Sequence, residues 1–246
     1  MDKPRGRFIV LDGLPGCGKS TQARLLSERL LNAVLNVEPT KALFGAVIRA
    51  YIERQAIPEE LLEQCYRYKS SENDFWPIAH HIINQLKLKM PLGEMERQIL
   101  FVADRVYDLE MNILPALAAG KTVIQDRYFF STLAFGYSGG LEIEWLWKIH
   151  QEAFAASSKI GGLWKPDLTV IFDLDPAVSM ARQKASGKVL DIFEEKPERL
   201  DKIREAYLQL SKRTDLSTGI SVINADQPAE KVFSQLEQLI KYQTAV

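Results

Sequence analysis

A glycine-rich segment near the start of the chain has the residue types needed to bind phosphate groups. Residues 13–20 read Gly-Leu-Pro-Gly-Cys-Gly-Lys-Ser and fill each defined position of the pattern G-x-x-x-x-G-K-[ST]. The glycines let backbone N–H groups turn inward around phosphate oxygens, and a following helix adds the positive end of its dipole. Lys19 would reach the β- and γ-phosphates of ATP, and the Ser20 hydroxyl would help to hold Mg²⁺. The predicted ATP-binding residues of this segment are Gly13, Leu14, Pro15, Gly16, Cys17, Gly18, Lys19, Ser20 and Thr21.

An acid and an arginine follow a second apolar run, at Asp126 and Arg127. The carboxylate of Asp126 could orient Mg²⁺ or its bound water, and the guanidinium of Arg127 could clamp a phosphate with two parallel hydrogen bonds. A plain ion pair at the end of a strand is the alternative, and it is compatible with the first interpretation. Lys19, Asp126 and Arg127 are therefore the candidate catalytic residues, and Ser20 and Asp126 the candidate metal ligands.

A third candidate site lies on a helix predicted from about Glu94 to Ala118. One apolar stripe at helical spacing consists of Ile99, Val102, Ala103, Val106, Leu109 and Ile113. Phe101 and Arg105 are four residues apart and are expected together on a non-core face, off that stripe. The ring could stack on a planar base while the guanidinium donates to its edge. A helix–helix contact with an incidental arginine is the alternative.

The elements that would position these residues alternate along the chain. Short apolar runs predict strands at Phe8–Asp12, Val34–Val37, Thr122–Gln125, Leu168–Asp173 and Ser221–Ile223. Helical patterns between them predict an α/β fold with a parallel sheet and helices on both faces. Ligands gather at the carboxyl ends of such strands. Four acids fall at these ends: Asp12, Glu38, Asp126 and Asp173.

A long excursion, residues 41–97, separates the second and third strands and contains three helical patterns, at Ala42–Ile52, Glu59–Lys69 and Pro77–Lys89. Its aromatic residues could cover a substrate pocket, make a subunit contact, or pack as a small core of their own. No internal repeat or linker indicates a second domain, so residues 1–246 are expected to form one domain.

Composition restricts the class of protein. A net charge of −1 argues against a wide basic face for a nucleic acid polymer. The uncharged stretches are too short to span a membrane, and the N-terminus leads straight into a strand with no signal peptide, so the cytoplasm is expected. Cys17 and Cys65 are not expected to pair, and no Cys/His cluster has metal-ligand spacing.

Several segments together resemble the thymidylate kinase family of P-loop nucleoside monophosphate kinases. The resemblance rests on residues 101–105, 115–121, 126–135, 166–169 and 172–174, with the glycine-rich loop within 11–21. It implies a P-loop NTPase fold with a five-stranded parallel sheet and a helical lid. It also implies transfer of the γ-phosphoryl of ATP to dTMP or a related deoxynucleoside monophosphate, and a homodimer.

The resemblance also implies roles for individual residues. Phe101 would stack on the thymine, Arg105 would bond the base edge or the acceptor phosphate, and Arg127 would hold that phosphate. Phe135 would pack under the sugar. A lid at about 182–196, with Arg182, would close over ATP, and residues 224–228 would form the adenine-side loop. Glu38, Lys41 and Tyr137 complete the candidate substrate-binding residues.

Some positions depart from the family pattern. Pro15 stands in the place of an acidic residue, Val37 in the place of an arginine, and Gly136 in the place of a polar residue that helps to fix the base. Lys41 could supply the missing charge, and Ile192 stands where the lid often has an arginine. These changes indicate a divergent member with a shifted acceptor or a slow rate.

Two other functions stay open at the level of sequence. In a deoxynucleoside kinase, Glu38 would act as general base on a neutral hydroxyl. A nucleotide-binding regulatory protein would bind ATP without turnover, which Pro15 and Val37 would suit. A monophosphate acceptor needs no base, because its second pKa is about 6 and its oxygen is already anionic at neutral pH.

Overall fold

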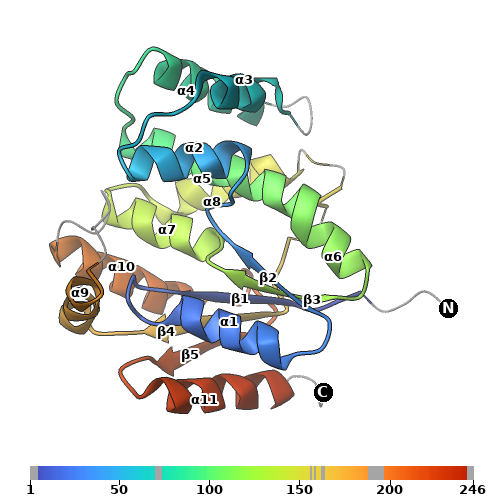
Figure 1. The fold of residues 1–246 in the computed structure, drawn as a ribbon, viewed down its shortest axis with the longest axis vertical. Coiled ribbons are helices and arrows are strands. Elements are labelled where there is room, and N and C mark those ends of the chain that lie inside the picture. The colour runs from blue at the N-terminus through green and yellow to red at the C-terminus, as the bar shows by residue number, and fades with distance from the viewer. Residues whose placement is uncertain are drawn as a thin grey trace.

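A five-stranded parallel sheet runs through the centre of the protein in the computed structural model (Figure 1). The structure describes residues 5–69, 74–155, 157, 159–161, 164–187 and 197–242. The strand order is β2-β3-β1-β4-β5. The strands are β1 (Phe8–Gly13), β2 (Ala33–Val37), β3 (Thr122–Asp126), β4 (Leu168–Asp173) and β5 (Ile220–Asn224). The predicted α/β class with a five-stranded parallel sheet is confirmed, and the bounds of each strand lie within one residue of those expected.

The central strand β1 shows why helices cover both faces of the sheet. Successive side chains of a strand point to opposite faces. Phe8 and Val10 accordingly enter one hydrophobic cluster, and Ile9 and Leu11 enter another. Because both sets are fully buried, each face of the sheet requires its own layer of helices.

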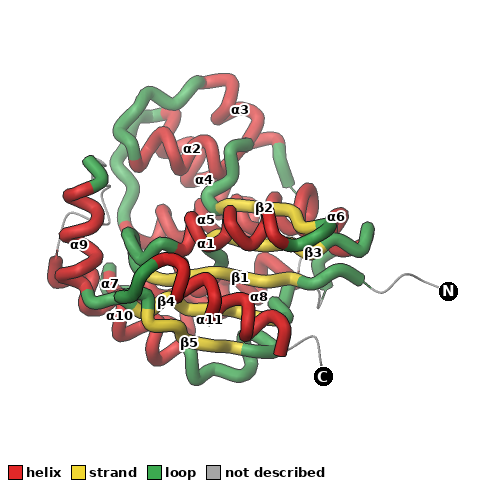
Figure 2. Tube along the Cα trace, turned by 60° about the horizontal axis from the view of Figure 1, so that its bottom comes forward, coloured by secondary structure: helices red, strands yellow, loops and turns green. Residues whose placement is uncertain are grey.

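The helices form these two layers (Figures 1 and 2). One face packs against α1 (Lys19–Arg29) and α11 (Ala229–Tyr242). The other face packs against α5 (Glu94–Asp108), α7 (Phe129–Ser138), α8 (Ile143–Ala155) and α10 (Pro197–Leu210). Helix α9 (Pro176–Ala185) follows β4 at the carboxyl end of the sheet, and its last turn contains the first residues of the predicted lid. The greater part of that lid, 188–196, lies outside the described residues.

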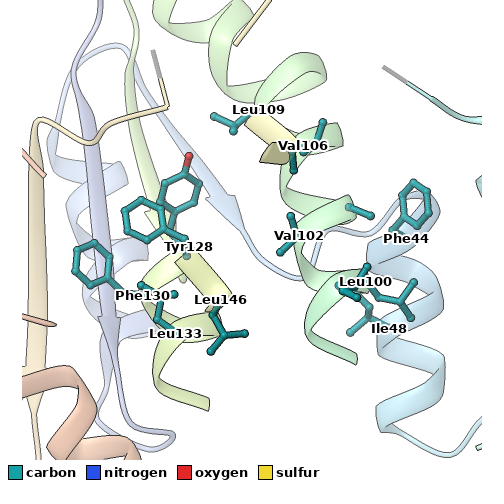
Figure 3. Close-up of a cluster of buried hydrophobic side chains, with 14 of the residues drawn as sticks. Phe44, Ile48, Leu100, Val102, Val106, Leu109, Tyr128, Phe130, Leu133 and Leu146 are labelled. Atoms are coloured by element: carbon teal, nitrogen blue, oxygen red, sulfur yellow. The ribbon is translucent and has the colours of Figure 1, made fainter. Parts of the chain in front are cut away.

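The helix predicted over 94–118 is divided into α5, a π-helical segment η1 (Leu109–Ile113) and α6 (Leu114–Ala118). Figure 3 shows that α5 is covered from two sides, with Leu100 directed toward Ile48 of another helix and Val102 directed toward α7. The expected apolar stripe is buried, and Leu100 and Arg105 outside it are buried as well. A helix enclosed in this way has little solvent-exposed face.

The excursion between β2 and β3 contains α2 (Leu43–Ile52), α3 (Glu59–Arg67) and α4 (Phe75–Lys87). Their bounds differ from the predicted ones by at most two residues. Phe44 contacts Tyr68 and Trp76 in a cluster of aromatic rings, at centroid distances of 6.0 and 5.9 Å. These aromatic residues therefore pack mainly against one another and against α5, as a helical elaboration with apolar packing of its own.

Cys17 and Cys65 are both free and buried. Within the described part of the chain, no helix is long and apolar enough to cross a membrane. The same residues contain no group of three or more His, Cys, Asp or Glu side chains that could hold a metal ion by themselves.

Candidate functional site

The glycine-rich loop connects β1 directly to α1, which begins at Lys19. Gly16 has a φ of 70°, and a Cβ atom there would lie 3.0 Å from the carbonyl oxygen of Ser179. Gly18 has a φ of 88° at the residue before α1, so both positions favour glycine. The hydroxyl of Ser179 on α9 donates to the carbonyl oxygen of Pro15 at 2.6 Å. The loop is thus held against α9, and Pro15 contributes through its backbone.

Lys19 is a cation without a carboxylate partner among the described residues. Its side chain is 5% exposed, and Nζ donates to the carbonyl oxygen of Leu14 at 3.3 Å. Burial, and secondly the positive charge of Arg127, lower the pKa of Lys19. A bound anion would relieve both effects, so this position suits a phosphate group.

The residues predicted to hold Mg²⁺ are brought together. The hydroxyl of Ser20 donates to Oδ2 of Asp126. The other carboxylate oxygen, Oδ1, is buried and has no hydrogen-bond donor in the described structure. Mg²⁺ binds hard oxygen ligands and usually takes one or two from the protein, with phosphates and water completing the shell. The pair of Ser20 and Asp126 fits such an ion.

Arg127 lies at the mouth of this loop in an uncommon backbone conformation, with a φ of 71°. Its Nη1 donates to Ser131 Oγ at 3.0 Å and to the carbonyl oxygen of Gly13 at 3.5 Å. The guanidinium also stacks on Phe135 at 5.4 Å. It forms no ion pair with Asp126 among the described residues, so the strand-end ion pair considered above is absent there. Among the described residues its Nε and Nη2 groups have no hydrogen-bond acceptor, which leaves donors for a phosphate.

A buried carboxylate, Asp12, connects the loop with two helices. It accepts hydrogen bonds from the backbone N–H groups of Gly13, Tyr128 and Ser131 at 3.0, 3.1 and 3.2 Å. It also accepts from the hydroxyls of Ser131 and Tyr207, both at 2.7 Å. The start of α7, which carries the partners of Arg127, is thereby fastened to the end of β1. The N-terminal end of α7 favours this negative charge.

The expectation that Arg105 lies on a non-core face is wrong. Its side chain is 1% exposed, and it forms a buried ion pair with Glu38 through Nε and Nη2. Nη1 donates to Thr132 Oγ1 at 3.0 Å and to His150 Nε2 at 2.7 Å. The physical reason is that the segment after β2 and helix α8 cover the side of α5 that the spacing left open. Phe101 remains half-buried.

His150 was not identified from the sequence, although it completes this cluster. Its Nδ1 donates to the carbonyl oxygen of Leu146 at 2.7 Å, which leaves Nε2 as the acceptor for Arg105. Burial and the charge of Arg105 hold the pKa of His150 well below its usual value. The imidazole is therefore neutral.

Glu38 is poorly placed as a general base for a nucleoside hydroxyl. It is buried, and both carboxylate oxygens accept from Arg105. Burial raises the pKa of Glu38 well above its usual value, although Arg105 opposes the shift. The neighbouring Thr40 is fixed by Asp104, which accepts from the Thr40 N–H at 2.8 Å and from its hydroxyl at 2.6 Å. The segment 38–40 is thus held rigidly beside the site through Arg105 and Asp104.

The remaining predicted residues lie in three places. Phe135 and Tyr137 are half-buried on α7. Lys41 is exposed just before α2 and forms no hydrogen bond or ion pair within the described part of the chain. Arg182 on α9 donates to the carbonyl oxygen of Ala225 at 3.0 Å and pairs with Asp226 at 3.2 Å. The start of the predicted lid is therefore joined to the predicted adenine-side loop.

Comparisons with known proteins agree with this geometry. A sequence model of the family described as thymidylate kinase matches residues 53–236. The chain is 35% identical to a protein called probable thymidylate kinase from Thermococcus kodakarensis, over 95% of this chain and 97% of that protein. It is 32% identical to a probable thymidylate kinase from Pyrococcus abyssi, over 97% and 98%. It is 30% identical to a thymidylate kinase from Carboxydothermus hydrogenoformans, over 96% and 98%. With a family match over most of its length, relatives aligned nearly end to end and a phosphate loop set in a five-stranded parallel sheet, the chain belongs to the thymidylate kinase family and is a nucleoside monophosphate kinase.

Proposed function

We propose that the chain transfers the γ-phosphoryl group of ATP to the phosphate of dTMP, forming dTDP and ADP. The observation that carries the proposal is the pair of cations at the end of β1. Arg127 is close enough for its charge to lower the pKa of Lys19, and neither residue forms an ion pair within the described residues. Two adjacent cations without carboxylate partners favour a site for anions on both sides of a transferred phosphoryl group.

On the donor side, residues 13–21 bind the phosphates of ATP through backbone N–H groups, and Lys19 reaches the β- and γ-phosphates. Arg182 and the loop 224–228, which are already in contact, lie beside the adenine. Ser20 and Asp126 would hold Mg²⁺, which would offset the negative charge of the phosphates.

On the acceptor side, Arg127 binds the phosphate of dTMP, Phe101 stacks on the base and Phe135 packs beneath the sugar. Glu38 supports the site through Arg105, and Lys41 and Tyr137 border it. An oxygen of the dTMP phosphate attacks the γ-phosphorus, the bond to the β–γ bridging oxygen breaks, and ADP leaves with that electron pair. The attacking oxygen is anionic at neutral pH, so no side chain has to remove a proton. Catalysis then consists of in-line positioning and neutralisation of charge by Lys19 and Arg127.

An acceptor panel tests this function. Purified protein with Mg-ATP is offered dTMP, dUMP, dCMP and thymidine, and ADP and the nucleotide products are measured. We expect dTDP from dTMP and no product from thymidine. Phosphorylation of thymidine alone would make the chain a nucleoside kinase, and ATP binding without product from any acceptor would make it a regulatory protein.

We further propose that the protein acts as a homodimer in the cytoplasm. Buried free thiols such as Cys17 and Cys65 are typical of a reducing compartment. Three apolar side chains, Leu88, Met90 and Met95, are exposed near the connection from α4 to α5, and burial of these side chains would favour a protein contact. Light scattering on the purified protein should give twice the mass of one chain, and the mass of a single chain would refute the dimer.

A further inference from the structure

One face of α5 runs along α7 and holds three polar or aromatic side chains in line. Phe101 follows Gln98 by three positions, and Arg105 follows Phe101 by four. At these spacings the three side chains fall within one sector of the helix. Arg105 contacts Thr132 at one end of this stretch. At the other end, Gln98 lies against Gly136, where an added Cβ would be 3.3 Å from Gln98 Cγ. The half-buried rings of Phe101 and Phe135 belong to the same two helices.

The donors of Arg105 are nearly all in use. A guanidinium has five N–H groups. In this structure Nε donates to Glu38, Nη1 donates to Thr132 and His150, and Nη2 donates once to Glu38. One N–H on Nη2 has no acceptor among the described residues and is left for a ligand. Arg105 can therefore donate to a single acceptor atom of a base. One such hydrogen bond does not distinguish the bases, so a second residue is required.

The side chain of Gln98 has the complementary group. Its Nε2 donates to Glu94 Oε1 at 2.7 Å, and since a carboxylate can only accept, this contact fixes which end of the amide is oxygen. Glu94 is itself held by Arg97 at 2.9 Å and Arg199 at 2.7 Å. The amide oxygen of Gln98 is buried and has no donor in the described structure. An unpaired acceptor in a 1% exposed side chain requires a partner that it does not find within the described protein.

We propose that Gln98 determines base specificity by accepting a hydrogen bond from N3–H of the acceptor pyrimidine. The inference rests on the proposed function and names a specificity residue for its acceptor site. The free N–H of Arg105 donates to O4 of the same base while the ring stacks on Phe101. Thymine and uracil present this pair, an acceptor at O4 beside a donor at N3. Cytosine presents the reverse pair, so its N3 lone pair would face the lone pairs of Gln98.

The acceptor site needs this second residue because α7 has no side chain at Gly136. A Cβ at 136 would also lie 2.6 Å from Leu146 Cδ1, so α8 leaves no room for a larger residue there. Gln98 occupies the adjacent space from the opposite helix. The amide that reads the base is thus supplied by α5 and oriented by Glu94.

The test compares dTMP with its N3-methyl analogue, which lacks the hydrogen that Gln98 would accept. In the wild type, kcat/KM for dTMP should exceed that for the analogue by at least about 100-fold, because the site leaves a buried acceptor unpaired. In Gln98→Leu, which is similar in size and lacks the acceptor, kcat/KM for dTMP should fall about 10- to 100-fold. For the analogue and for dCMP, kcat/KM should fall much less. The ratio of kcat/KM for dTMP to that for the analogue, and the ratio for dTMP to that for dCMP, should therefore both decrease. KM for ATP should not change.

Gln85→Leu is the matched control, because the amide oxygen of Gln85 on α4 is also buried and unpaired within the described structure. It should leave both ratios at the wild-type values. Thermal unfolding of both variants separates a folding defect from a change in recognition. If the wild type phosphorylates dTMP and Gln98→Leu keeps the wild-type ratio of dTMP to analogue, Gln98 has no role in recognition. If the wild type does not phosphorylate dTMP, the proposed function fails instead.

Discussion

At the scale of single residues, the site depends on cations that neutral groups hold in place. Lys19 donates to a backbone carbonyl oxygen, and Arg127 donates to a carbonyl oxygen and a hydroxyl. Neutral partners keep a cation oriented without neutralising it, so its attraction for a phosphate is retained. Arg105 is the opposite case, since it is paired with Glu38, and we propose that it gives a ligand only one hydrogen bond.

Replacement of Lys19 by Ala should abolish phosphoryl transfer, with a loss in kcat of at least about 10³-fold. Lys19 is the only lysine or arginine of residues 13–21, so the loop has no second cation to take its place. Lys148→Ala is the control, because Lys148 is an exposed lysine of α8 whose ion pair, with Glu152 at 3.8 Å, lies at the surface. Steady-state kinetics with Mg-ATP and dTMP check this, and activity of Lys19→Ala near that of the control would exclude the loop as the ATP site.

Replacement of Arg127 by Ala should reduce kcat/KM for dTMP about 10²- to 10³-fold and leave the Kd of ATP nearly unchanged. The reason is that its guanidinium contacts Phe135 and Ser131 of α7, which we propose as the acceptor side. Calorimetric titration with an ATP analogue gives the Kd, and Arg24→Ala, which alters an exposed arginine of α1, is the control. An equal loss of ATP affinity would place Arg127 on the donor side.

At the scale of elements, buried carboxylates fasten helices to strand ends. Asp12 joins β1 to α7 and α10, and Asp104 joins α5 to the segment after β2. Each contact spans elements far apart in the chain, so each depends on correct packing of the layers. Because such carboxylates are removed from water, their ionisation affects the stability of the whole packing arrangement.

Asp104 should make the protein less stable as the pH rises. Burial raises its pKa to about 7, against the hydrogen bonds from Thr40. An unfolded Asp has a pKa of about 3.9, so the unfolded chain loses this proton first. The free energy of unfolding therefore falls between about pH 4 and pH 7, and the loss is complete above pH 7. At about 1.4 kcal/mol per pKa unit, it amounts to a few kcal/mol.

Denaturant titration at pH 5 and pH 8 measures this effect. The loss of stability between the two pH values should be smaller in Asp104→Asn than in the wild type, since the variant has no titrating group at 104. Asp201→Asn, at an exposed position of α10, should keep the wild-type difference. The same pH difference in all three proteins would show that Asp104 is not a buried titrating group.

At the scale of the whole molecule, the carboxyl edge of the sheet separates two halves of the site. In the proposed function, the donor half comprises the loop after β1, α9 and the loop after β5, which are in contact, and the acceptor half comprises α5 and α7. Lys19 and Arg127 lie where the halves meet. Each nucleotide should therefore contact mainly its own half.

Thermal unfolding should report the two halves separately. At about 100 times its Kd, each ligand stabilises the folded state by about 2.7 kcal/mol, and for a chain of this size that raises Tm by about 5–10 °C. Lys19→Ala should lose the shift from a non-hydrolysable ATP analogue and keep that from dTMP. Arg127→Ala should do the reverse. Loss of both shifts in both variants would mean that the halves are not independent.

The sequence alone determined the chemistry that depends on neighbouring residues and on strand ends. The loop 13–20, the strands and the acid–arginine pair at 126 and 127 are local patterns, and local patterns specify local backbone. Tertiary structure decided what lies against each side chain. Asp12 and Tyr207 meet across 195 positions, and Arg105 is enclosed by Glu38 and His150 because two other elements pack on its helix. The surroundings of Gln98 are likewise set by the tertiary structure, which places Gly136 of α7 beside it. Glu94 accepts a hydrogen bond from its amide nitrogen. Such contacts depend on how whole elements pack, and helical periodicity specifies a face without specifying what covers it.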